Sequence, residues 1–268
     1  SDMLFTEKVI LVEGLAEKLL LPQFAEKCGL DKDLEYNHIS IVEIGGINFD
    51  HFLPLFNETA NKVLCFQDND YKYFEKNDNG VKTFKNLLDY QNYVDNLSFN
   101  EKNTDNISFQ SQNNYGSTFE NELFIDNFEI GHKLFKLVGP ENLIDFISNL
   151  EQEINEQETI LDIRRWLKSL ENSNIIHSAT KGKIMKQLTI YKTVLENLNE
   201  DELEGFEDIN TFEELEKSIH KICFSNIFLS YCKNKKGDFA LNLLMDEELM
   251  NKIKVPNYIK EGFEWLQI

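Results

Sequence analysis

Apolar residues in the first part of the chain fall into four short runs that predict parallel β-strands. The runs cover residues 9–12, 39–44, 63–66 and 107–110. Strands of a parallel sheet are buried on both faces, so they read as continuous apolar runs. Apolar residues at helical spacing lie between the runs, at 15–28, at 49–56 (which Pro54 must shorten) and around 81–90. This alternation predicts an α/β fold, with a parallel sheet of about four strands flanked by helices.

The pattern becomes entirely helical from about Phe128 onward. Apolar residues recur every three or four positions through 134–150, 160–170, 181–198 and 212–232. A further helix is expected over 235–244, and a last one from Pro256 to near Trp265. We therefore expect an α/β core over residues 4–127, an all-helical insert over 128–220, and C-terminal helices over 221–268 that return to the core.

Composition is that of a globular protein with a substantial core. The 268 residues are 41% apolar and 12% aromatic, and no apolar run reaches transmembrane length. The four cysteines show no paired spacing typical of metal or redox sites. We expect reduced thiols, a cytoplasmic location and no membrane partner.

Net charge is −20, which taken alone argues against a nucleic-acid partner. Phosphate backbones select Lys and Arg, although bound divalent cations can invert the local field of an acidic protein. The densest basic stretch contains Lys181, Lys183, Lys186 and Lys192. A DNA-binding track is the less favoured interpretation of these lysines. Arg164 and Arg165 fit a salt-bridged surface better, and Trp166 fits helix packing.

Carboxylates follow three of the four predicted strands. Glu13 ends the first strand and Glu17 lies one helical turn later, Asp68 and Asp70 follow the third strand, and Glu120 comes after the fourth. The carboxyl ends of parallel strands meet at one edge of a sheet. Residues two apart point the same way while the chain is extended, so Asp68 and Asp70 can face one ion.

This set of side chains favours hard divalent cations. Carboxylate oxygens suit Mg²⁺ or Mn²⁺, and no Cys/His set suggests zinc. Two such ions would offset the repulsion among five carboxylates and could support phosphodiester cleavage. The neighbouring Lys235 and Lys236 offer a fixed positive charge for the transition state. Each piece alone has a plain structural explanation, such as a polar loop or a helix N-terminus, and their convergence favours a joint site.

These residues resemble a known family. Val12-Glu13-Gly14 and Asp68-Asn69-Asp70 are similar to the acidic motifs of Toprim domains. The resemblance narrows to the overcoming-lysogenization-defect (OLD) nucleases, which include the nuclease subunit of the Gabija anti-phage system. The segments that carry this narrower resemblance are Glu13 to Pro22, Ile41 to Phe49, Thr118 to Glu120, Lys236 to Ala240 and Pro256 to Ile259.

The resemblance implies Mg²⁺- or Mn²⁺-dependent nicking or cleavage of DNA on a Rossmann-like Toprim fold, in phage defence. By motif match, Glu13, Glu17, Asp68, Asp70 and Glu120 would be the metal ligands for two ions. Glu13 would also orient the attacking water, and Lys236 would be the transition-state cation. Glu122 is the alternative to Glu120, because the polar segment 71–117 loosens the match there.

The resemblance also implies partners. The family carries an ABC-type ATPase ahead of the Toprim domain, and this sequence has no Gly-x-x-x-x-Gly-Lys-Ser/Thr phosphate loop. ATP would therefore act only through a domain absent from this chain. We expect DNA as substrate, a homo-oligomer in the full protein, and a helicase as a further candidate partner.

Two other functions remain open from the sequence. One is a non-catalytic module that docks an ATPase or a helicase. The other is topoisomerase- or primase-like chemistry, for which none of the nine tyrosines stands in a recognisable strand-passage context.

Overall fold

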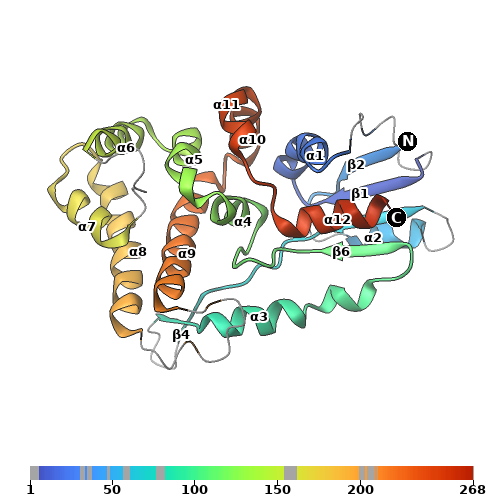
Figure 1. The fold of residues 1–268 in the computed structure, drawn as a ribbon, viewed down its shortest axis with the longest axis horizontal. Coiled ribbons are helices and arrows are strands. Elements are labelled where there is room, and N and C mark those ends of the chain that lie inside the picture. The colour runs from blue at the N-terminus through green and yellow to red at the C-terminus, as the bar shows by residue number, and fades with distance from the viewer. Residues whose placement is uncertain are drawn as a thin grey trace. The chain divides into compact units, whose positions relative to one another are not determined.

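The computed structural model describes residues 6–30, 34, 38–46, 49–56, 61–76, 82–153, 162–198, 203, 209 and 211–267. They belong to two compact units (Figure 1). The first comprises Ser1–Lys72, Asp89–Leu123 and Lys236–Ile268, and the second comprises Tyr73–Leu88 and Phe124–Lys235. The expected boundary at 220/221 falls inside α9, which runs unbroken from Phe212 to Cys232. The division in the structure therefore differs from the expected one, because a continuous helix moves the boundary to 235/236.

The first unit is built on a four-stranded parallel sheet. Its strands are β1 (Lys8–Val12), β2 (Ile39–Glu43), β3 (Lys62–Phe66) and β6 (Ile107–Gln110), in the order β2-β1-β3-β6. Every neighbouring pair is parallel, with Val12 level with Phe66 across β1 and β3. The predicted α/β fold with a parallel sheet of four strands is thus confirmed.

Alternate side chains of the central strands enter two different cores. Val9 and Leu11 join a cluster with Val63, Cys65 and Phe109, which is completed by residues of the short helices α2 (Phe49–Phe52), η2 (Leu53–Leu55) and η3 (Ser98–Lys102). Helix α12 (Asn257–Gln267) packs on the sheet through Leu64 and Phe66, which a Cβ at Gly262 would meet at 3.1 and 2.9 Å. The strands read as continuous apolar runs because both faces are covered.

Five more of the described helices lie wholly or partly in the first unit. Helix α1 (Leu15–Lys27) follows β1 directly and packs against α10 (Lys236–Met245), which α11 (Glu247–Lys252) succeeds. Helix α4 (Phe119–Asp126) begins in the first unit. Helix α3 runs from Leu87 to Asp95.

The second unit contains a short hairpin and a set of helices with an aromatic core. The hairpin pairs β4 (Phe74–Lys76) with β5 (Lys82–Phe84). The helix predicted around 81–90 is therefore wrong in its first half, because residues 82–84 pair as a strand. The helices are η4 (Phe128–Ile130), α5 (Gly131–Val138), α6 (Glu141–Glu153), α7 (Ile163–Asn172), α8 (Ser178–Asn197) and α9.

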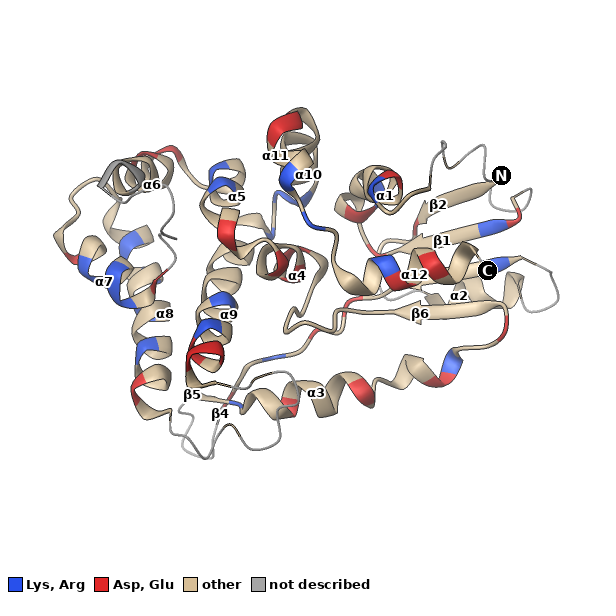
Figure 2. Cartoon of the chain, viewed as in Figure 1, with Lys and Arg blue, Asp and Glu red and all other residues tan. Residues whose placement is uncertain are grey.

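Trp166 is at the centre of the packing in this unit. Its ring contacts Phe135, Phe146 and Phe224 at centroid distances of 5.0–5.9 Å. The interpretation of Trp166 as a packing residue is therefore confirmed. Lysines and arginines gather on α7 and α8 (Figure 2). Of the helices that the structure describes, none combines the length and apolar character needed to cross a membrane.

Candidate functional site

Two acidic motifs meet where the direction of the sheet order changes. The chain moves from β1 outward to β2, and then returns to the other side of β1 as β3. Ligand sites of open parallel sheets lie at such a switch point, beyond the carboxyl ends of the strands. Glu13 follows β1 and Asp68 follows β3, and the Asp68 amide donates to Glu13 Oε1 at 3.0 Å. The predicted meeting of these two strand ends is therefore present.

Two donors hold the Asp68 carboxylate, one from just after β6 and one from the first residue of α4. Gln112 Nε2 donates to Asp68 Oδ1 at 2.7 Å, and the Phe119 amide donates to the same oxygen at 2.9 Å. Gln112 follows β6, which neighbours β3. Carboxylates that accept charge-assisted hydrogen bonds are fixed in orientation. Asp68 is therefore held in one orientation before any ligand arrives.

Glu17 and Glu120 lie in the first turns of α1 and α4 and are almost fully buried. Glu17 is 5% exposed and Glu120 is 0% exposed. Lys236 Nζ, at the start of α10, lies 2.8 Å from Glu120 Oε2, which also accepts from the Thr118 hydroxyl at 3.1 Å. Lys236 is thus the member of the predicted lysine pair that contacts an acid of this site.

Two carboxylate oxygens in this cluster lack a donor. Glu17 Oε2 and Glu120 Oε1 are buried and accept no hydrogen bond from any described residue. Gly14 makes room for the first of them, since a Cβ there would lie 3.1 Å from Glu17 Oε2. A buried acceptor without a partner carries a desolvation cost. A cation bound at these two oxygens would therefore offset this desolvation cost.

The acids also raise each other's proton affinity. Burial raises the pKa of Glu17 to about 7, and the charge of Glu120 adds to the effect. Burial, followed by the charges of Glu17 and Glu120, raises the pKa of Asp68 well above its usual range. Burial raises the pKa of Glu13 despite the Asp68 amide, which favours the ionised form. Burial lowers the pKa of Lys236, but Glu120 and Asp68 outweigh it and the net pKa is raised.

Asp70 departs from the extended geometry expected of it. Its φ is +56°, in the left-handed region, and its side chain is exposed. The chain turns at this residue because its amide donates to the Ser117 carbonyl at 3.0 Å. The argument that residues two apart point the same way therefore does not hold here. Asp70 instead acts on Glu13 through its charge, which contributes to the raised pKa of Glu13.

Glu122, the alternative to Glu120, is committed to the loop before α4. Its Oε1 accepts from the amides of Asn113 and Asn114 at 2.9 and 3.0 Å, and its Oε2 accepts from the Gly116 amide at 2.8 Å. A Cβ at Gly116 would lie 2.7 Å from Glu122 Cα, so only glycine fits there. Glu120, with one oxygen free of donors, is the better-placed ligand of the two.

Two buried polar residues were not anticipated from the sequence. Gln112 is 1% exposed and its Oε1 accepts from the Asn69 amide at 2.9 Å, so one side chain joins Asp68 to the next peptide. Asn69 is 2% exposed, and its Nδ2 donates to the Gly116 and Gln112 carbonyls at 2.9 and 3.0 Å. Both lie in polar segments without periodicity. The only sequence signal was the position of Asn69 between two aspartates.

The carboxylate oxygens of this site suit divalent cations, although no metal-holding arrangement is complete among the described residues. Among the described residues, no three His, Cys, Asp or Glu side chains already stand in a metal-holding arrangement. The donors are nevertheless all hard carboxylate oxygens, two of them are buried without partners, and three carboxyl groups have raised pKa values. Mg²⁺ and Mn²⁺ prefer such oxygens, and their charge would favour the ionised forms. A cation would therefore offset the cost of burying these carboxylates together with their mutual repulsion.

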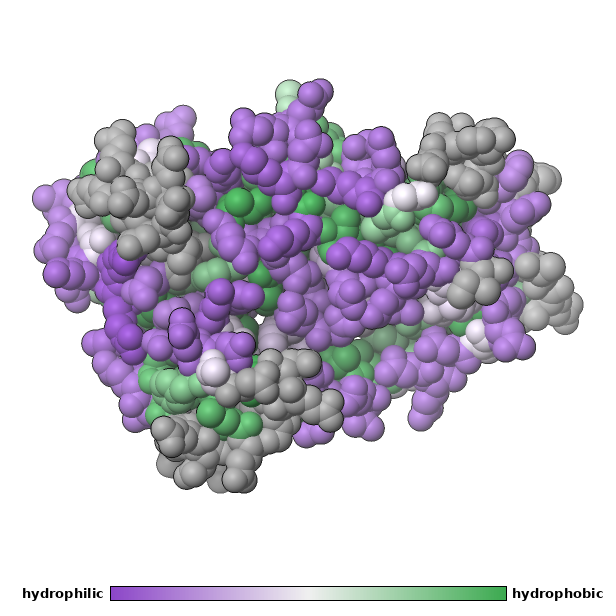
Figure 3. Space-filling model, in the orientation of Figure 1, coloured by the Kyte–Doolittle hydropathy of each residue, from purple (hydrophilic) through white to green (hydrophobic). Residues whose placement is uncertain are grey.

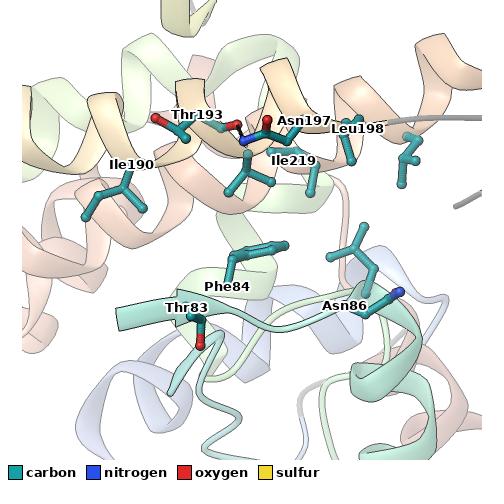
Figure 4. A pocket seen from close by; sticks show the side chains of 11 residues that line it. Thr83, Phe84, Asn86, Ile190, Thr193, Asn197, Leu198 and Ile219 are labelled. Atoms are coloured by element: carbon teal, nitrogen blue, oxygen red, sulfur yellow. Dashed lines mark hydrogen bonds between the residues drawn. The ribbon is translucent and has the colours of Figure 1, made fainter. Parts of the chain in front are cut away.

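The second unit holds a cavity of a different kind. It has a volume of about 550 Å³ and is lined by residues of β5, the start of α3, α8 and α9, including Phe84, Ile190 and Ile219 (Figure 4). A hydrophobic area lies in the region of β5 in Figure 3. None of the described residues lining this cavity is ionisable. The acid–base groups of this chain therefore point to the sheet edge rather than to this cavity.

Comparison with known proteins agrees with this location. Residues 4–70 match the family model described as "Overcoming lysogenization defect protein-like, TOPRIM domain", a range that contains Glu13, Glu17, Asp68 and Asp70. The chain is 32% identical over 72 residues to Endonuclease GajA of Bacillus cereus (strain VD045). That alignment covers 27% of this chain and 12% of the length of GajA.

Solved structures with similar folds include two C-terminal regions of OLD proteins. The one from Xanthomonas campestris pv. campestris is 17% identical, with a TM-score of 0.46, and the match covers 100% of this chain and 95% of that one. The one from Burkholderia pseudomallei is 18% identical, with a TM-score of 0.38 and coverage of 98% of both chains.

Proposed function

We propose that this chain, which carries an OLD-like Toprim domain in residues 4–70, is the nuclease region of a protein that nicks or cleaves DNA. The observation that supports this most strongly is the cluster of buried acids with one lysine at the switch point of the sheet. Glu17 Oε2 and Glu120 Oε1 lack donors there, and Lys236 lies 2.8 Å from Glu120. Similarity to an endonuclease over 72 residues agrees with it.

Glu13, Glu17, Asp68, Asp70 and Glu120 would hold two divalent cations, Mg²⁺ or Mn²⁺. Bound cations of this kind supply charge stabilisation to a phosphate and make water a better nucleophile. Glu13, held by the Asp68 amide, would orient the attacking water. Lys236 is partly exposed and cationic, so it would stabilise the charge that develops on the phosphate oxygens. Gln112 and the Phe119 amide keep Asp68 in place while this happens.

The wider role follows the resemblance of the motifs. We propose that an ABC-type ATPase domain works with this region in the whole protein, that ATP acts only through it, and that the whole protein is a homo-oligomer in the cytoplasm. Phage defence is the biological role that we propose, and a helicase remains a candidate partner.

A nicking assay on supercoiled plasmid tests the proposal. The wild-type chain should convert supercoiled to open-circular DNA with Mg²⁺ or Mn²⁺, and Glu13→Ala and Asp68→Ala should each reduce the rate by about 100-fold or more. Glu26→Gln, on an exposed position of α1, is the matched control and should keep full activity. Full activity in both site variants would reject the site.

A calorimetric Mn²⁺ titration separates the nuclease from an assembly module. The nuclease should take up Mn²⁺ in a manner that Asp68→Ala weakens and Glu26→Gln does not. A module that only docks an ATPase or a helicase would show neither nicking nor uptake that depends on these carboxylates.

A further inference from the structure

The α7–α8 hairpin, residues 163–197, reverses the charge of the rest of the chain. It contains seven lysines and arginines and two acids, a net charge of +5, whereas the remaining residues sum to −25. Charge segregation of this kind indicates a surface for a polyanion. Lysines and arginines mark both helices in Figure 2, on a scaffold fixed by the buried Trp166, Ile184 and Leu188.

Three of these lysines are available to a partner. Lys168, Lys183 and Lys186 are exposed and form no ion pair with another described residue. Three other cations of the hairpin already have partners within the chain. Arg164 lies 3.0 Å from Glu216, Lys192 lies 3.3 Å from Glu196, and Lys181 donates to the Glu171 and Ser173 carbonyls.

Several cations of the hairpin lie near the N-termini of their helices. Arg164 and Arg165 stand in the first turn of α7, and Lys181, Lys183 and Lys186 lie in the N-terminal half of α8. Neither helix has an acid in its first turn. The helix dipole disfavours cations in the first turn, where Arg164, Arg165 and Lys181 lie, and its effect falls off beyond that turn. Lys168, Lys183 and Lys186 lie beyond the first turns, so the helix ends neither favour nor disfavour their charge.

We propose that the α7–α8 hairpin binds the phosphate backbone of nucleic acid, with Lys168, Lys183 and Lys186 as its free contacts. That the nucleic acid is the DNA substrate rests on the proposed function. Lysine contacts to phosphates position a duplex without reading its sequence. The surface thus supplies the attraction for phosphate that the acidic remainder of the chain lacks.

Fluorescence anisotropy of a labelled 20-base-pair duplex, in EDTA so that no cleavage occurs, tests the proposal on the full chain. The salt series runs from about 20 to 150 mM NaCl, where backbone contacts are resolved. The triple variant Lys168→Gln/Lys183→Gln/Lys186→Gln should bind about 10-fold more weakly at the lowest salt. Its slope of log K against log salt should be smaller by about 2.7, from 0.9 for each lost contact.

A matched variant carries the same change of charge elsewhere. Lys217, Lys254 and Lys260 are exposed and lie outside the hairpin, and their triple change to Gln should alter affinity by less than about two-fold. The hairpin variant should melt at nearly the same temperature as the wild type, because the three lysines are exposed and form no ion pair with another described residue. A hairpin variant that melts lower and binds like the control would show that the lysines are structural.

Three further results would overturn the proposal. These are equal binding by the two triple variants, no duplex binding by the wild type at the lowest salt, and binding to phosphatidylserine vesicles in place of DNA. Failure of the proposed function looks different. A chain that binds DNA through the hairpin but never nicks plasmid keeps this inference and rejects the nuclease.

Discussion

At the scale of single residues, Glu17 shows best how the fold opposes ionisation at this site. The residue is 5% exposed, its Oε2 has no donor among the described residues, and Glu120 repels its charge. Burial of this kind is costly unless a partner arrives. Without a cation, Glu17 is therefore a source of instability at neutral pH, and that instability can be measured.

Glu17→Gln should stabilise the metal-free protein at high pH. The pKa of Glu17 is about 7 in the folded protein against 4.5 ordinarily. The contribution of Glu17 to the free energy of unfolding is therefore fully present below pH 4.5 and is lost as pH rises through 7. In EDTA, urea unfolding at pH 8 should show the variant more stable than the wild type by on the order of 1–3 kcal/mol. At pH 5 the difference should be smaller. Glu26→Gln should show no such dependence, and a Glu17→Gln variant that is less stable at pH 8 would contradict the argument.

Gln112 should act on metal affinity through Asp68. Gln112→Met keeps the length of the side chain but removes the donor to Asp68 Oδ1 and the acceptor for the Asn69 amide. Loss of such a supporting hydrogen bond typically weakens metal binding about 10- to 100-fold. Mn²⁺ titration of the folded variant should show this loss.

The control for Gln112 lies two residues earlier. Gln110 Nε2 donates to the Ser108 hydroxyl at 3.2 Å, so Gln110→Met should leave the Mn²⁺ affinity unchanged. Equal affinity in Gln112→Met and Gln110→Met would show that Asp68 does not depend on the amide of Gln112.

At the scale of elements, the strands and most helices follow from local pattern, and the exceptions have identifiable causes. The helix expected over 212–232 is observed at Phe212–Cys232, where Thr211 and Glu214 form a capping box. The helix expected around 81–90 begins only at Leu87, because residues 82–84 pair with 74–76. A hairpin partner several residues away leaves no mark on the spacing of Phe84, Leu87 and Leu88, which fits a helix equally well.

The candidate site likewise has a part that the sequence predicts and a part that it does not. Topology alone brings Glu13 and Asp68 together, because parallel strands end at one edge. The turn at Asp70 and the role of Gln112 depend on long-range hydrogen bonds, from the Asp70 amide to the Ser117 carbonyl and from Gln112 to Asp68. No local sequence pattern predicts these hydrogen bonds.

Two helical glycines should respond oppositely to alanine. A Cβ at Gly262 in α12 would lie 2.9 Å from the Phe66 ring in the core, whereas a Cβ at Gly182 in α8 meets nothing within 4 Å. Both changes gain helix propensity, but only the first forces α12 away from the sheet. Gly182→Ala should stabilise by about 0.5–1 kcal/mol and Gly262→Ala should destabilise by about 1–3 kcal/mol. Denaturant unfolding measures both, and equal stabilisation would mean that α12 yields without cost.

At the scale of the whole molecule, the net charge of −20 penalises the folded state through self-repulsion. The penalty has two parts with different ranges. Any salt screens the repulsion between exposed acids on the surface, with a Debye length of about 10 Å at 0.1 M. The buried Glu17 and Glu120 and the half-buried Asp68 are largely shielded from mobile ions, so bulk salt reaches them poorly.

Sodium and magnesium should therefore stabilise the chain by separable amounts. Raising NaCl should raise the melting temperature of the wild type and of Glu17→Gln alike, because surface screening does not involve the site. Mg²⁺ at the same ionic strength should add a further increment in the wild type, which follows from binding to the folded state alone. Because a neutral amide at position 17 takes away one of the five predicted metal ligands, the Mg²⁺ increment should shrink in Glu17→Gln while the NaCl increment stays. Scanning calorimetry of both proteins decides this, and an undiminished Mg²⁺ increment in the variant would mean that magnesium acts on the surface and not at the cluster of buried acids.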